Sequence, residues 1–178
     1  MMVVLLLELR ASAQTPLLRE AWGVRLGVLA IPEYPGAHPL LEPYYESATS
    51  DSGALTMIAD LTIAFTSFSM IQFPTYDYDQ LVDYGFHAGV RYALKSTGAI
   101  APFCGAAFGF DVYPDPVWPD TIGHVSASFP MTIGALYAAS HSAQFEFAFV
   151  ARPQWYFRQG WVVAYALNIG GRFLSFSE

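Results

Sequence analysis

The chain has 178 residues and a formal net charge of −7; 54% of its residues are hydrophobic, 16% aromatic and only 13% charged. Soluble domains carry about 25% charged residues, and nucleic-acid binding needs a clustered basic surface, which a chain with one lysine does not offer. No run of roughly 18 or more apolar residues is present, so the pattern disfavours a helical membrane protein. The single cysteine, Cys104, excludes an intramolecular disulfide.

The N-terminal residues resemble an export signal. A short apolar core at 3–7 is followed by Ala-Ser-Ala, the small-residue pattern of a cleavage site. The core has no positively charged segment before it, and Glu8 and Arg10 interrupt the apolar stretch, which a truncated or misassigned start would explain. We predict a signal peptide over 1–13 and one folded domain over 14–178. The alternative is an ordinary first strand or helix.

The first half of the domain contains strands and one long polar segment. Strict alternation of apolar with small or charged residues predicts strands over 20–30 and 55–66. Between them, a stretch rich in Pro, Tyr, Glu and Ser predicts a surface loop over 33–52. The region 67–80, interrupted at Pro74, has the weakest pattern. We count it as a short third strand, because closed antiparallel barrels normally have an even strand number.

The clearest pattern in the chain is a hairpin over 82–113. Its two halves alternate an apolar, aromatic face with a small or charged face, and Lys-Ser-Thr-Gly at 95–98 supplies the turn. Each half runs for about a dozen residues, whereas soluble strands have roughly 5–6 and tilted membrane-spanning strands about 9–11. Lipid would face the apolar side, and the small residues would fill the interior of a narrow barrel.

The remaining chain repeats this alternation. It predicts strands over 124–137, 144–152 and 161–173, separated by connections at 114–120, 138–142 and 158–160. The predicted fold class is all-β: an eight-stranded antiparallel up-and-down transmembrane β-barrel. With the C-terminus inside, the predicted outward loops are those at 33–52, 75–80, 114–120 and 158–160.

Two sets of side chains are candidates for a role. The alternation of side chains along each strand places charged residues on the inner face of the barrel. Because an unpaired buried charge is costly, these residues should pair with one another in a polar network that fills the lumen. The predicted lumen network is Arg25, Asp60, Asp83, His87, Arg91, Asp111, Glu146, Arg152 and Arg172. Aromatic residues near strand ends predict an interfacial girdle of Trp22, Tyr92, Trp118, Trp155, Tyr156, Trp161 and Phe173.

Three segments carry a family resemblance. The strand 101–110, APFCGAAFGF, together with Gly-Val-Arg-Tyr at 89–92 and Gly-Gly-Arg-Phe at 170–173, resembles the small outer membrane β-barrel families. These are outer membrane proteins A and X and the opacity-type surface proteins. The family tends to end on an aromatic residue, whereas Phe176 here is followed by two more residues.

The resemblance implies a monomer in the bacterial outer membrane that contacts membrane lipid and has no cofactor, no metal and no catalytic residue. Its role would be structural, or would be interaction with a surface ligand through extracellular loops, above all the one at 33–52. It predicts no nucleic-acid partner.

Three alternatives stay open. A soluble secreted lipocalin-like barrel would turn its apolar faces inward around a ligand. A small pore would leave the charged lumen open. His124-Val-Ser126 has the spacing seen in lipid A deacylase barrels, where His is the general base for Ser. That family continues with Asn, however, where Ala127 stands here, and parity sends both residues to the lumen.

Overall fold

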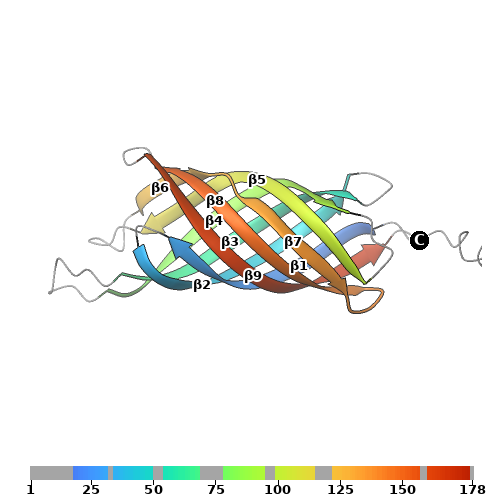
Figure 1. The fold of residues 1–178 in the computed structure, drawn as a ribbon. Helices are drawn as coiled ribbons and strands as arrows, with labels where there is room; N and C mark the ends of the chain where they lie inside the picture. The colour runs from blue at the N-terminus through green and yellow to red at the C-terminus, as the bar shows by residue number, and fades with distance from the viewer. Residues whose placement is uncertain are drawn as a thin grey trace, which may run out of the picture.

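The computed structural model describes residues 18–31, 34–49, 54–68, 78–94, 99–114, 122–156 and 160–176, and all its regular elements are strands. Figure 1 shows them wrapped into one barrel of steeply tilted strands. Within these ranges, no helix is long and apolar enough to cross a membrane. The strands are β1 (Leu18–Ile31), β2 (Tyr34–Ala48), β3 (Leu55–Phe68), β4 (Tyr78–Ala93), β5 (Ile100–Pro114), β6 (Ile122–Ser128), β7 (Met131–Ala138), β8 (Ala143–Tyr156) and β9 (Gly160–Phe176).

The strands form a closed ring of eight, as predicted. Neighbours pair antiparallel, and β1 pairs with β9 to close the wall. β6 and β7 form one wall strand, since both keep the same register against β5 and β8. The interruption lies at Phe129–Pro130, where Pro130 and the adjacent Pro153 of β8 have no N–H to give to the ladder.

The wall has two distinct ends. Leu18 lies opposite Phe176, so β1 begins and β9 ends at the same end, here called the terminal end (Figure 1). The chain also turns there between β2 and β3, β4 and β5, and β7 and β8. The connections after β1, β3, β5 and β8 lie at the opposite, far end.

One predicted loop is wrong. Residues 34–48, inside the loop expected over 33–52, form β2, which pairs with β1 and with β3. Its prolines, including Pro39 and Pro43, suggested a loop, but these two occupy outward positions of an extended strand. Because β2 is a wall strand, the long 33–52 loop does not exist.

The predicted third strand is also wrong. Ser67 belongs to the end of β3 and residues 78–80 to the start of β4, while 69–77 lie outside the described residues. The count of eight therefore holds with β2 in place of the strand expected at 67–80. The predicted loops at 75–80, 114–120 and 158–160 follow strands that end at the far end, but residues 75–77, 115–120 and 158–159 lie outside the described residues. Pro114 still belongs to β5, residues 78–80 to β4, and Gly160 starts β9 with φ 87°.

The two faces of the wall have opposite chemistry. Large apolar side chains are exposed on the outer face of β1 and of β3 to β9, among them Leu167 at 68% exposure and Phe147 at 60%. Inward positions hold charged, small and aromatic residues and a few aliphatic ones, almost all of them buried. A soluble barrel needs the reverse arrangement, so the burial pattern argues against the lipocalin-like alternative.

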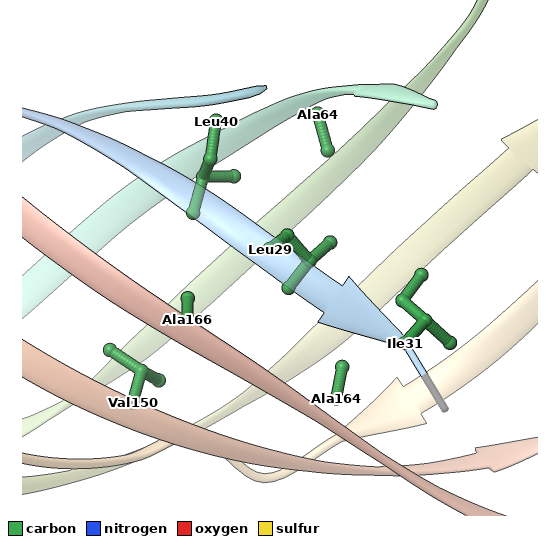
Figure 2. Close-up of a cluster of buried hydrophobic side chains, with 7 residues drawn as sticks. All are labelled: Leu29, Ile31, Leu40, Ala64, Val150, Ala164 and Ala166. Carbon is green, nitrogen blue, oxygen red and sulfur yellow. The ribbon is translucent and has the colours of Figure 1, made fainter. Parts of the chain in front are cut away.

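The interior changes character along the barrel. Near the terminal end, Phe103 and Leu136 pack with Ala148. The middle holds the charged residues. Toward the far end lies a second apolar group, here called the far-end cluster (Figure 2): Leu29, Ile31, Leu40, Ala64, Val150, Ala164 and Ala166.

Candidate functional site: a charged core inside the barrel

The structure places all nine residues of the predicted lumen network inside the wall. Each has at most 8% of its surface exposed. They come from six wall strands that are far apart in sequence, because every second residue of a strand faces the lumen. All of them except Asp83 meet in three groups, described in turn below. Arg152, which lies 3.7 Å from Asp111, links the second group to the third.

The first group centres on Glu146 of β8. Its carboxylate accepts hydrogen bonds from Arg25 Nε at 2.8 Å, from Arg91 at 3.0 and 3.1 Å and from the Tyr44 hydroxyl at 2.7 Å. The Tyr44 ring also lies 4.2 Å below the Arg25 guanidinium. Three strands that are not neighbours of β8 in the wall, β1, β2 and β4, are thus tied to it through one carboxylate.

The second group centres on Glu42 of β2. It accepts hydrogen bonds from Arg152 at 2.7 Å, Asn168 at 2.6 Å and Thr62 at 3.2 Å. Arg25 lies 3.6 Å from the same carboxylate, which links this group to the first. Glu42 therefore joins β1, β3, β8 and β9 across the interior.

Two carboxylates and one tyrosine of this core are absent from the predicted lumen network. Glu42, Tyr44 and Glu46 lie within the stretch expected to be a loop, yet they alternate on one face as a strand requires. Glu46 forms ion pairs with Arg91 and Arg172, both at 2.5 Å. The signal available in the sequence was this period-two alternation, which Pro39 and Pro43 obscured.

The third group centres on His87 of β4. Nδ1 lies 2.8 Å from an Asp60 oxygen, while Nε2 lies 2.8 Å from Ser128 Oγ and 3.2 Å from Asp111. Gln154 donates to Asp111 at 2.8 Å. A serine, a histidine and an aspartate linked in this order by hydrogen bonds also form the catalytic triad of many hydrolases. Here, however, the His87 and Ser128 side chains are fully buried, and the contacts of His87 join β4 to β3, β5 and β6.

Two other inward residues carry less information. Asp83 of β4 is buried opposite Ala64 in the register. Ser126 is 1% exposed and faces the lumen, whereas the His124 side chain lies outside the described part of the structure. A deacylase of the kind weighed above would need its serine on the lipid-facing side.

The core leaves little space. The cavity bounded by Arg25, Asp60 and Arg91 has a volume of about 20 Å³. That is room for about one water molecule. Among the described residues, no three His, Cys, Asp or Glu side chains are grouped as metal ligands.

Comparisons with known proteins bear on the fold. No family model matches the sequence, and no curated protein matches it significantly. The crystal structure of Neisserial surface protein A is similar over 86% of this chain and 94% of that one, with a TM-score of 0.62 and 13% identity. The N-terminal β-barrel domain of Pseudomonas aeruginosa OprF is similar over 87% and 98%, with a TM-score of 0.52 and 11% identity. The chain has the fold of the small outer membrane β-barrels.

In such a barrel, aromatic side chains are expected at two levels. Trp22 and Phe173 are paired residues near the terminal end, and Tyr92 lies at the same end of β4. Trp155 and Trp161 are paired near the far end. All five point outward with at least 40% of their surface exposed. Trp118 and the Tyr156 side chain, also predicted for the girdle, lie outside the described residues.

Proposed function

We propose that this chain is a non-enzymatic protein of the bacterial outer membrane, a monomeric barrel that contacts lipid along its whole outer face. The observation that carries the proposal is the reversal of the two faces. Large apolar side chains are exposed on the outside, while four arginines and their acidic partners are buried inside. Only a surrounding lipid phase makes that arrangement favourable.

We further propose that the barrel is a closed anchor for its far-end connections, which interact with a ligand at the cell surface. The charged core supports closure, because Glu146 and Glu42 each bind groups from several strands and the cavity beside Arg25 and Arg91 is close to the size of one water molecule. Eight-stranded barrels are usually filled in this way. One of the similar structures is named as a surface protein, which agrees with such a role.

Gel mobility tests the membrane proposal. The protein is isolated from membrane and soluble fractions, folded in detergent and run with and without boiling. We expect it in the membrane fraction, with a band that shifts on boiling because the closed wall resists unfolding at room temperature. A protein that stays soluble without detergent and shows no shift would contradict the proposal.

Two assays distinguish a closed barrel from the two alternatives, a small pore and a deacylase. In planar bilayers, we expect no resolved conductance steps, because a chain of ion pairs crosses the lumen. With lipid A in mixed micelles, we expect no released fatty acid above the background of a Ser126→Ala variant. Discrete conductance would favour the small pore, and Ser126-dependent release would favour the deacylase.

A further inference from the structure

The wall has one seam in which pairing stops early. The β2–β3 ladder runs from Ala48–Thr56 to Leu40–Ala64 and skips Glu42 and Pro43. Among the described residues, no β2–β3 pair lies beyond Leu40. Yet β2 continues to Tyr34 and β3 to Phe68, and there they pair only with β1 and β4.

Proline explains where the pairing fails. Along a strand, successive residues direct their N–H and C=O groups to alternate neighbours. Pro43 has no N–H and should therefore interrupt only the ladder toward which its backbone groups point. The β1–β2 ladder is unbroken from His38 to Ser47, whereas the β2–β3 ladder is interrupted at Pro43. The backbone N–H and C=O groups of the odd-numbered residues of β2 therefore point toward β3. Pro39 has the same parity. The strand therefore offers β3 no N–H at Pro39, where the seam begins to open.

Apolar side chains line the lumen on the β1 and β2 side of this seam, whereas Asp83 of β4 is buried opposite Ala64 of β3. Leu40 and Ala64, the last pair of the ladder, both belong to the far-end cluster (Figure 2). The interior of a membrane barrel is normally polar. In a membrane, the far-end cluster would therefore lie beside the surrounding hydrocarbon, with only a short unpaired stretch of wall between them. In the described register, no β2–β3 pair beyond Leu40 has to be broken for the two strands to part there.

One polar atom lies at the same place without a partner. His38 is the next inward residue of β2 after Leu40 and lies opposite Leu29 of the cluster. It is 1% exposed, and within the described part of the chain its Nε2 has no hydrogen-bond partner. A buried nitrogen of this kind costs free energy until it is paired.

We propose that the β2–β3 seam is a lateral portal through which one acyl chain of a membrane lipid enters the far-end cluster, with an ester oxygen of the lipid bound to His38 Nε2. The proposal rests on the proposed function, since only a barrel in a membrane has acyl chains beside this seam. The bilayer supplies the apolar chain, and the cluster and His38 together match an amphipathic molecule that has one polar group next to the chain.

Alanine methyl groups report such a chain directly. The protein is labelled at its alanine methyls and His rings and placed in micelles of a lysophosphatidylcholine with a 14-carbon chain. Intermolecular NOEs are then measured. We expect chain NOEs to the inward Ala64 and Ala166, and glycerol NOEs to the His38 ring. The outward Ala88 and Ala106 should contact chains in any membrane barrel, and the buried Ala148, outside the cluster, should contact none.

A proline variant tests the route. Pro39→Val restores an N–H on the β3 side and should close the seam, so the NOEs to Ala64 and Ala166 should be lost. Pro153→Val, the matched change in β8, should leave them in place. Chain NOEs at Ala88 and Ala106 with none at Ala64 and Ala166, or NOEs that Pro39→Val does not change, would overturn the portal. The absence of chain NOEs at Ala88 and Ala106 would instead contradict the proposal that the protein is a membrane barrel.

Discussion

Arg152 of β8 donates a hydrogen bond to Glu42 of β2 at 2.7 Å, directly across the lumen. The two residues are 110 positions apart in sequence, and both side chains are almost completely buried. Side chains, and not only the backbone ladder, therefore connect opposite sides of the wall.

Glu42→Gln should destabilise the barrel strongly. The amide keeps the shape of the side chain but removes the charge that balances Arg152 and Arg25, and an uncompensated buried partner costs about 3 kcal/mol or more. We expect this loss in urea unfolding from lipid vesicles. Glu20→Gln, at a half-exposed position near the start of β1, is the control and should change the free energy of unfolding by less than about 0.5 kcal/mol. Equal stability of the two variants would show that Glu42 is not a linking residue.

Gly109→Ala should destabilise the His87 group. A Cβ at Gly109 would meet the Phe86 carbonyl oxygen first and would lie 2.5 Å from His87 Cδ2, so β4 and the His87 ring must move, which costs about 1–3 kcal/mol. Gly171→Ala is the matched change, because its nearest neighbour, the Gln144 carbonyl oxygen, would be 3.9 Å away. Unfolding in the same vesicles compares the two. If Gly109→Ala were as stable as Gly171→Ala, the tight fit around His87 would be wrong.

Leu167→Arg should test the lipid-facing belt. Leu167 is 68% exposed and lies midway along β9 between Trp161 and Phe173. A charge at the bilayer midplane costs about 2–4 kcal/mol, whereas near an interface it costs about 0–1 kcal/mol. Leu167→Arg should therefore lose much more stability in vesicles than Phe173→Arg. A similar small effect for both would place this face in water.

Tryptophan fluorescence should locate the two aromatic levels. In variants that keep only Trp22 or only Trp161, lipids brominated near the glycerol should quench more than lipids brominated near the chain end. Because Trp22 lies toward the terminal end and Trp161 toward the far end, a quencher in the outer solution should reach one of them preferentially. Deep quenching of both residues would contradict the girdle.

The alternation of side chains was enough to predict most of the wall and to place Arg25, His87 and Arg172 inside it. It failed for β2, because Pro39 and Pro43 resemble loop residues when only the sequence is read. A proline is tolerated in a wall strand when its missing N–H faces a seam that is weakly paired, and that information lies in the neighbouring strand.

The partners within the core could not be predicted for a related reason. Parity shows which side a residue faces but not its height along a tilted barrel, and the height decides which charges meet. Glu146 binds Arg25 and Arg91 because the offset between neighbouring strands brings three distant positions to one level. The strand stagger that sets this offset is a property of the closed ring.

The pairing of β1 with β9 has a consequence for synthesis of the protein. Strand β1 can pair on its second edge only after β9 has been synthesised, because β9 is its neighbour there and Leu18 lies opposite Phe176. A nascent chain that stops before β9 leaves two open edges, on β1 and on β8, which can pair with other chains. Biogenesis therefore depends on keeping every incomplete chain apart from its copies until the final strand arrives.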